Sequence, residues 1–348
     1  MKHIILAFFL SLNVCSFAQN SSTDSLQNQK KTNTTQKLPS NLIHSFIPKI
    51  ISLNYDQQTS RKLVFESKDG EEVKIELDYV QRIDVNAILP LFKIKKRHAF
   101  NLALRYQNLY TSPEKLTIND ISYSTDANWK SGAVTTFGYA GQYKIKNKSL
   151  RIGSSILFLG ENPFDIKRVS GLITANLTLK KSATSVFTVG IAGLINAKST
   201  LPILPTIAYF KQISSKINLE LILPALINTK YVHSANHYSN LGLRLDTFNP
   251  FFNLNEASIN GFQNTPDLEF RNSDIKLYTN TQYHLTSNIW LSGEVGYAWQ
   301  IQSRMIKKGD IPQNYILEAN PNNRAYFNVG IFMRPKVTLE LLKKMAGK

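Results

Sequence analysis

The sequence predicts an all-β protein, a transmembrane antiparallel β-barrel of about 14 strands with short periplasmic turns and longer extracellular loops. The first observation is the stretch 273–302, where apolar residues such as Leu277 and Val295 alternate with polar ones such as Lys276 and Glu294. A two-residue period is typical of strands with one apolar and one polar face. The other two observations are an export signal and a regular alternation of short and long connections.

The length of the runs favours a membrane barrel. The stretch 273–302 divides at a turn near 286–288 into two strands of a hairpin. Each is longer than the roughly five or six residues usual in soluble proteins. A tilted strand needs roughly 9–11 residues to cross a bilayer.

Residues 1–18 are expected to be a secretory signal peptide. They have a basic start, an apolar run and a small-x-small cleavage site ending at Ala18. The alternatives are the hydrophobic start of a soluble protein and a lipoprotein signal ending at Cys15, although Val14 occupies a position where a small residue is expected. Because Cys15 is the only cysteine, cleavage after Ala18 would exclude disulfides and thiolate metal sites.

Charge and hydropathy narrow the classes further. After the signal, no run of about 18 apolar residues is present, so a membrane location requires a closed barrel. The formal net charge of +17 is compatible with nucleic-acid binding, but export and the lack of a recognisable binding motif argue against it. Many of the lysines lie in or beside predicted turns. We interpret them as solubilising charge, with attraction to anionic surfaces such as lipid head groups as the alternative.

The domain organisation follows from composition and periodicity. Residues 19–46 are rich in Asn, Gln, Ser, Thr and Lys, which predicts a disordered periplasmic tail. The barrel is expected over 47–334, followed by a short basic tail at 335–348. Twelve strands are the alternative if the part between 217 and 248 is misread. The expected strands are 49–56, 73–92, 100–110, 133–145, 150–159, 169–179, 185–196, 203–211, 217–223, 225–232, 239–248, 273–285, 289–302 and 324–333.

The connections test the barrel independently, because every second connection of such a barrel is a short periplasmic turn. A secreted β-sandwich is the soluble alternative. The sandwich explains less well the long strands and the alternation of short turns with long loops. It also explains less well the aromatic residues near strand ends, because such residues prefer a membrane interface. Short turns are expected at 93–98, 146–149, 180–184, 212–216, 234–237 and 286–288, long loops at 57–72, 111–132, 160–168, 249–272 and 303–323, and interface aromatics at Tyr106, Tyr110, Tyr143, Tyr209, Trp290 and Trp299.

The polar faces of the strands should line the lumen, with both signs of charge in similar number. A wide ion-selective pore would more often carry a ring of one sign, so mixed charges predict a narrow channel or a filled barrel. No single residue is assigned a catalytic, cofactor-binding or metal-binding role. The expected lumen residues are Lys74, Glu76, Asp78, Arg82, Asp84, Arg105, Lys144, Arg151, Glu220, Lys230, Arg244, Asp246, Asp274, Lys276 and Glu294.

One segment has a pattern seen in enzymes. His237, Ser239 and Asn240 resemble the His-x-Ser-Asn segment of outer-membrane phospholipases, in which a histidine activates a serine nucleophile. Leu241 stands where that family has glycine, and the predicted topology places the segment on the periplasmic side. A turn with polar caps explains the same residues. His284 is expected to be a hydrogen-bonded residue of the interior, because no His/Asp/Glu cluster has metal-ligand spacing.

The chain resembles the outer-membrane barrels of Bacteroidota, in particular an uncharacterised family called domain of unknown function 6268. The resemblance is carried by residues 16–19 (Ser-Phe-Ala-Gln), by 217–224 (Ile-Asn-Leu-Glu-Leu-Ile-Leu-Pro) and by 241–245 (Leu-Gly-Leu-Arg-Leu), and covers about 47–334. The chain departs from many barrels in lacking a carboxyl-terminal aromatic residue. Residues 337–345 are expected to form a short amphipathic helix instead. The resemblance implies the barrel fold and no activity.

The sequence therefore predicts a monomeric barrel of the cell outer membrane that passes small solutes passively or selectively. The first alternative is a non-conducting barrel that anchors a periplasmic or surface partner, and a remote one is a phospholipase. We expect no enzymatic activity, no cofactor and no nucleic-acid partner. The expected partners are outer-membrane lipid, lipopolysaccharide and the barrel insertion machinery.

Overall fold

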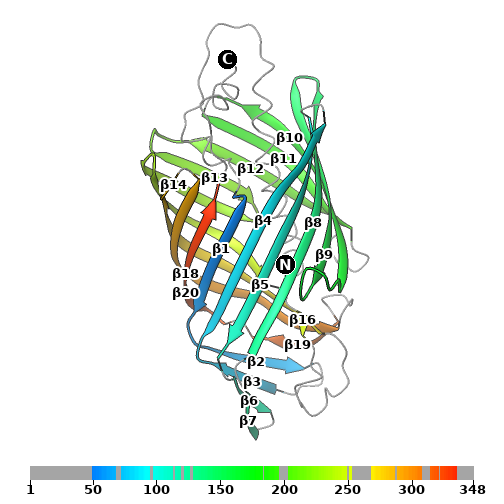
Figure 1. Cartoon of the computed structure of the whole chain (residues 1–348), viewed down its shortest axis with the longest axis vertical. Coiled ribbons are helices and arrows are strands. Elements are labelled where there is room, and N and C mark those ends of the chain that lie inside the picture. Colours follow the sequence, from blue (N-terminus) through cyan, green and yellow to red (C-terminus); the bar gives the residue numbers. More distant parts are fainter. Residues whose placement is uncertain are drawn as a thin grey trace.

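The chain folds into one closed antiparallel barrel, shown in the computed structural model of Figure 1. Closure occurs at β1 (Ile51–Gln58), which pairs along its whole length with β4 (Val80–Ile94) on one side and β20 (Arg324–Met333) on the other. The described residues are 49–67, 72–94, 97–112, 114–118, 121–125, 128–182, 184–195, 203–248, 251–252, 268–286, 288–307, 314–320 and 322–334.

The barrel has 14 strands, as predicted, and not twelve. Each strand pairs with its neighbour in chain order, so the sheet is an up-and-down meander. Besides β1, β4 and β20 the barrel strands are β5 (His98–Thr111), β8 (Asn128–Ile145), β9 (Lys148–Gly160), β10 (Arg168–Lys181), β11 (Ser185–Ile195), β12 (Ile203–Gln212), β13 (Ile217–Leu223), β14 (Leu226–Ser234), β15 (His237–Phe248), β17 (Leu268–His284) and β18 (Ile289–Lys307).

Short strands prolong the sheet beyond one end of the barrel, which we call the extension end. The opposite end carries the short turns, Lys49 and Arg334, and we call it the turn end. The extension runs from β18 through paired short strands and lies at the lower end of the barrel in Figure 1. Its strands are β19 (Tyr315–Ala319), β2 (Arg61–Ser67), β3 (Glu72–Leu77), β6 (Glu114–Ile118) and β7 (Ile121–Thr125), and β16 (Phe251–Phe252) pairs separately with β17.

The extension corrects two expectations. The loops expected at 57–72, 111–132 and 303–323 contain strands, and the single strand expected over 73–92 is divided into β3 and β4. The division lies at Asp78 and Tyr79, where the Ser112 hydroxyl accepts a hydrogen bond from the Asp78 amide at 2.9 Å. The Ser112 amide in turn donates to the Tyr79 carbonyl at 3.3 Å. The alternation continues across this bend, so periodicity alone could not reveal it.

Four expectations lie outside the described residues. They are the signal peptide at 1–18, the tail at 19–46, residues 253–267 of the long loop expected at 249–272, and the carboxyl-terminal tail at 335–348 with its helix at 337–345. Within the described part of the chain, no helix is long and apolar enough to span a bilayer.

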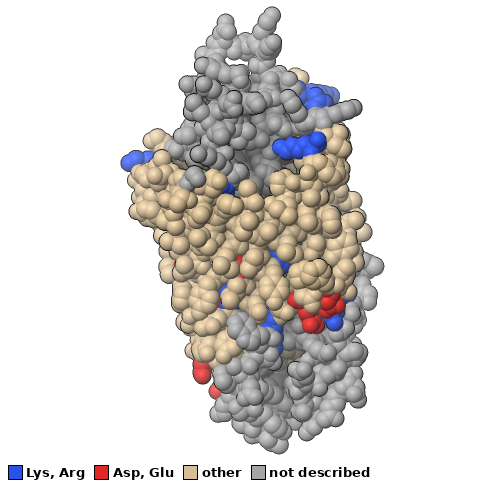
Figure 2. Space-filling model, viewed as in Figure 1, with Lys and Arg blue, Asp and Glu red and all other residues tan. Residues whose placement is uncertain are grey.

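The outward face of the barrel is apolar. Outward side chains near the middle of the strands are about half exposed, for example Ile191 at 53%, Val295 at 55% and Leu241 at 60%. Their inward neighbours along the same strands, such as Ala192 at 4% and Glu294 at 7%, are buried. Figure 2 shows the result as a broad, mostly uncharged zone with Lys and Arg along its upper margin. Such a belt is what a barrel presents to lipid.

The aromatic residues near strand ends divide between the two faces. Tyr143 and Trp299 are exposed on the outside at 40% and 37%, as expected for interface residues. Trp290 was wrongly expected there. It is 4% exposed and packs inside the barrel with Tyr238 and Phe332. The reason is register, because Trp290 alternates with the outward residues Ile289 and Leu291.

An arginine in the apolar belt should destabilise the barrel, whereas the same change in a turn should not. We expect Ile191→Arg to lower the free energy of unfolding from lipid vesicles by about 2–4 kcal/mol, because the charge is forced into hydrocarbon. Ile213, 56% exposed in the turn between β12 and β13, provides the matched control Ile213→Arg, with an effect below about 1 kcal/mol. Urea titration in vesicles measures both. Equal losses would contradict the membrane-facing assignment of the belt.

Candidate functional site

The candidate site is the lumen, which most of the predicted lumen residues line. The expectation was wrong for Lys74, Glu76 and Asp78. These residues lie on β3 and at the bend after it, outside the barrel. Glu76 forms an exposed ion pair there with Lys62. Lys144 is exposed at the turn end of β8. The inward set comprises Arg82, Asp84, Arg105, Arg151, Glu220, Lys230, Arg244, Asp246, Asp274, Lys276 and Glu294, each buried or half-buried.

A fully buried lysine forms the centre of the lumen. The side chain of Lys276 is 0% exposed, and its Nζ lies 3.1 Å from Asp56 Oδ2 and 2.8 Å from Asp246 Oδ2. Arg82 adds a second cation, with Nη2 2.9 Å from the same Asp246 oxygen and 3.7 Å from Asp56 Oδ2. The Lys276 ammonium also lies 4.2 Å from the centre of the Tyr326 ring. Two cations and two carboxylates thus balance inside the barrel, as buried charges require.

These ion pairs cross the lumen rather than following the wall. Around the barrel, β1, β20, β18 and β17 separate β4, which carries Arg82, from β15, which carries Asp246. The contact between Arg82 and Asp246 therefore crosses the interior of the barrel. We call such an ion pair across the lumen a chord. Around this cluster, bidentate contacts join Arg244 to Glu294 at 2.5 and 2.7 Å.

A second chord lies toward the extension end. Arg168 on β10 forms an ion pair with Glu269 on β17, and Arg271 holds the same carboxylate with Nε at 3.0 Å. Strands β11 to β15 separate β10 from β17 on the shorter way round. Arg168 and Glu269 therefore reach toward each other across much of the barrel. Together the two chords narrow the lumen.

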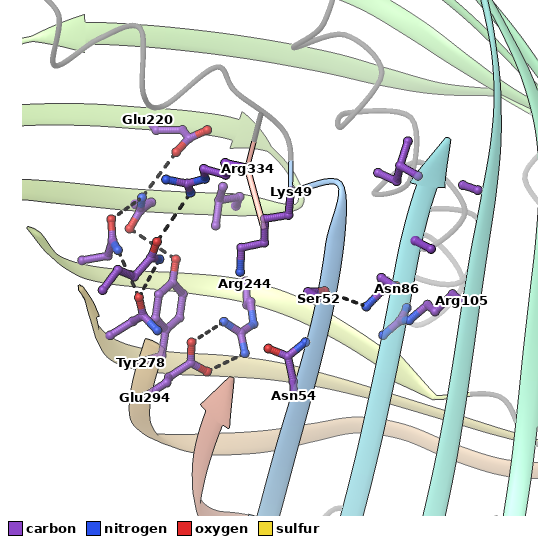
Figure 3. Close-up of a pocket in the computed structure, with 18 of the residues that line it drawn as sticks. Lys49, Ser52, Asn54, Asn86, Arg105, Glu220, Arg244, Tyr278, Glu294 and Arg334 are labelled. Atoms are coloured by element: carbon purple, nitrogen blue, oxygen red, sulfur yellow. Dashed lines mark hydrogen bonds and ion pairs between the residues drawn. The ribbon is translucent and has the colours of Figure 1, made fainter. Parts of the chain in front are cut away.

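A cavity of about 460 Å³ lies between the central ion pairs and the turn end (Figure 3). The figure shows Arg244, Glu294 and Tyr278 on one wall and Asn86 and Arg105 on another. Amides and hydroxyls form most of the remaining polar lining, among them those of Ser52, Asn54, Asn228, Asn240, Asn280 and Gln282.

The charged residues that line this cavity are predominantly cationic. Two of the five cations are neutralised locally: Arg105 by Asp84 at 2.8 Å and Arg244 by Glu294 at 2.5 Å. The other three are Lys49, Lys230 and Arg334, and none of them forms an ion pair within the described part of the chain. The one further carboxylate on the lining is Glu220, which accepts a hydrogen bond from Asn228 Nδ2 at 3.3 Å.

Aromatic rings hold these three cations, which we call the cation triad. Lys49 Nζ lies 4.1 Å from the centre of the Phe332 ring and Lys230 Nζ 3.8 Å from that of Tyr238. The Arg334 guanidinium lies 4.9 Å from Phe332 and 5.3 Å from Trp290. Tyr238, Trp290 and Phe332 are the buried cluster described above. A ring face attracts a cation without neutralising its charge.

Lys49 precedes β1 at the turn end, and its ammonium is desolvated there. Desolvation and, to a smaller extent, the positive charge of Arg334 lower the pKa of Lys49 to about 8, against the opposing effect of Glu294. Lys49 is therefore largely charged at neutral pH and loses its proton at mildly alkaline pH.

The phospholipase-like segment does not assemble a triad. His237 lies on the outer face at the turn end, where it stacks between His233 and Tyr283 at 4.2 Å from each. The Ser239 hydroxyl is hydrogen-bonded to His233 Nε2 at 2.9 Å, not to His237. Asn240 points to the opposite face and lines the lumen. Ser239 and Asn240 are consecutive residues of β15, so strand geometry sends their side chains to opposite sides.

His284 was expected to face the interior with a hydrogen bond. Its ring stacks on that of the inward Trp290 at 4.6 Å, and its Nδ1 lies 3.2 Å from Asn236 Oδ1. Within the ranges that the structure describes, no group of three or more His, Cys, Asp or Glu residues could hold a metal ion.

Sequence reasoning missed several important lumen residues. Lys49 is the first residue of the first expected strand and Arg334 follows the last one, and neither was included in the expected lumen set. Arg168, Glu269 and Arg271 lie in segments that were expected to be loops. The inward residues change from odd to even numbers along β17, from Glu269 and Arg271 to Asp274 and Lys276, because the register shifts between Ser273 and Asp274. A strict period of two therefore could not have placed Glu269 and Arg271 inside.

Comparisons with known proteins find barrels of low similarity. No family model and no curated protein matches the chain. A FadL homologue of Pseudomonas aeruginosa is 9% identical, with a TM-score of 0.38 over 89% of this chain and 95% of that one. Outer membrane phospholipase A from Escherichia coli is 9% identical, with a TM-score of 0.35 over 86% and 97%. The Pseudomonas putida toluene transporter TodX is 10% identical, with a TM-score of 0.33 over 88% and 94%. Similarities of this size carry no functional argument for this chain.

Removing the buried lysine should cost far more than removing an exposed one. We expect Lys276→Met to destabilise the barrel by about 3–5 kcal/mol, because Asp56 and Asp246 are left with Arg82 alone. Lys62→Met, which breaks the exposed pair with Glu76, is the matched control and should cost less than about 1 kcal/mol. Urea unfolding from vesicles measures both, and equal small effects would contradict the central role of Lys276.

Proposed function

We propose that the chain is an outer-membrane β-barrel that forms a narrow channel for small solutes. The observation that carries the proposal is the combination of a closed barrel with an apolar outside and a polar lumen that retains a cavity of about 460 Å³. Polar lining supports passage of hydrophilic solutes, and the cross-lumen ion pairs limit their size. The proposal includes a monomeric chain in contact with outer-membrane lipid, and no catalytic role.

A second candidate function is favoured by the chord near the extension end. The Arg168–Glu269 pair and the buried Arg271 place charged side chains across the lumen. If this barrier does not admit ions, the barrel is a non-conducting anchor for a periplasmic or surface partner. The two candidates differ in one measurable property, which is conductance.

Single-channel recording of the refolded full chain in a planar bilayer tests the proposal. We expect small, steady unitary steps for the unchanged protein. The double variant Arg168→Ala/Glu269→Ala should give larger steps, because it removes both halves of the chord without changing the net charge. The matched control is Lys62→Ala/Glu76→Ala, which removes an ion pair outside the barrel and should leave the steps unchanged.

Each outcome is informative when folding is verified by β-sheet circular dichroism and heat-modifiable migration. Silence from the folded parent together with steps from the Arg168/Glu269 variant would identify a barrel closed by the chord. Silence from both would exclude the channel and favour the anchoring barrel.

A further inference from the structure

We infer that the cavity at the turn end is a binding site for small multivalent oxyanions, bound between Lys49, Lys230 and Arg334. The ligand class comprises solutes with a phosphate, sulfate or clustered carboxylate group. This inference deepens the proposed channel function by naming its solute class, and it is carried by the cation triad and its surroundings.

The charge balance of the cavity is the first argument. Arg105 and Arg244 are neutralised by carboxylates, so their charge is not available to a solute. The cation triad is opposed by Glu220 alone, and Glu220 forms no ion pair with described residues. A net positive charge inside a barrel is more costly than one at the surface unless an anion neutralises it. A bound dianion would leave the site close to neutral.

The way the triad is held is the second argument. Rings, rather than carboxylates, position the two ammonium groups. Their N–H donors therefore have no hydrogen-bond acceptor among the residues that the structure describes. Aromatic faces also fix long, flexible side chains, so less conformational entropy is lost when an anion binds.

The hydrogen bonds of Arg334 provide the third argument. Its guanidinium donates to the Tyr238 hydroxyl, and Nη2 lies at the long distance of 3.5 Å from Gln282 Oε1. Its Nε is buried and has no hydrogen-bond partner among the described residues. Buried donors in native proteins are nearly always satisfied. Arginine presents its donors in a fork that matches an oxyanion.

The size of the cavity agrees with a small solute. Ligand pockets typically measure about 300–1,000 Å³, and this cavity measures about 460 Å³. Its amide lining, from residues such as Asn54, Asn228 and Asn280, offers both donors and acceptors to the rest of a hydrophilic molecule. The site lies toward the turn end of the barrel, next to Lys49 and Arg334, which flank the first and last barrel strands.

Calorimetric titration of the refolded full chain in detergent with sodium sulfate, at constant ionic strength, tests the site. We expect saturable binding, weakened at least about tenfold by Lys230→Gln and by Arg334→Gln, since each removes a charged donor. Lys230→Arg should retain binding. Lys216→Gln, at an exposed turn between β12 and β13, is the matched control and should bind as the parent does.

The outcomes separate this inference from the channel itself. Sulfate binding by a barrel that is silent in bilayers would support the site and overturn only the channel. Steady conductance without saturable binding, or binding that the Lys230 and Arg334 variants leave unchanged, would overturn the site and leave the channel standing.

Titration with succinate in place of sulfate tests whether the site also binds clustered carboxylate groups. Competition between succinate and sulfate supports a shared oxyanion site, and independent binding of the two anions would overturn it.

The ionisation of Lys49 makes a separate prediction about pH. Sulfate carries the same charge from pH 6 to pH 9, and the charged groups that act on Lys49 are Arg334, Arg244, Glu294 and Asp84. Because Lys49 loses its proton as the pH rises through about 8, sulfate affinity should be lower at pH 9 than at pH 6.

The variant Lys49→Gln isolates this contribution from that of Lys230 in the same cavity. It should bind sulfate more weakly than the parent at pH 6 and show a smaller decrease between pH 6 and pH 9. An unchanged pH profile and unchanged affinity would exclude Lys49 from the site.

Discussion

The hydrogen-bond ladder between β1 and β20 is the interaction on which the rest of the structure depends. Eight residue pairs, from Ile51 with Met333 to Gln58 with Tyr326, join the first and last barrel strands. Without this ladder both strands would present a row of unsatisfied backbone groups, which a membrane does not tolerate. Closure also fixes which face of every strand is inside. The separation of an apolar belt from a polar lumen is therefore a consequence of the same ladder.

A closed barrel with polar inward positions must satisfy many charged groups in a confined space. This chain does so by pairing charges across the lumen, as at Lys276 with Asp56 and Asp246. Such pairs replace the apolar core of a soluble protein, and they reduce the free cross-section. Near the turn end, three cations lie on aromatic faces and have no carboxylate partner in the described part of the chain. The lumen thus divides into a balanced, filled part and a cationic part with space for a solute.

Much of the fold was predictable because alternation is a local property. The inward positions of Arg82, Lys230 and Glu294 follow from the period of two, and the strand number follows from counting such runs. Pairing across the lumen is not local. It depends on the stagger of neighbouring strands, which sets the height of each side chain, and no feature near Arg168 in the sequence indicates Glu269 as its partner. Trp290 shows the same limit, since its aromatic character indicated an interface and its register placed it inside.

The meander topology also determines how the barrel can assemble. Strands β4 to β18 can each pair with the strand before them as the chain is added, but β1 pairs on its second side only with β20. Until β20 arrives, the growing sheet has two open edges, and open edges recruit strands of other molecules. The central ion pairs cannot form earlier either, because Asp56 and Lys276 are 220 residues apart. Closure and charge neutralisation therefore come together as a late step, and an incompletely assembled chain would carry unmatched charges and exposed strand edges at the same time.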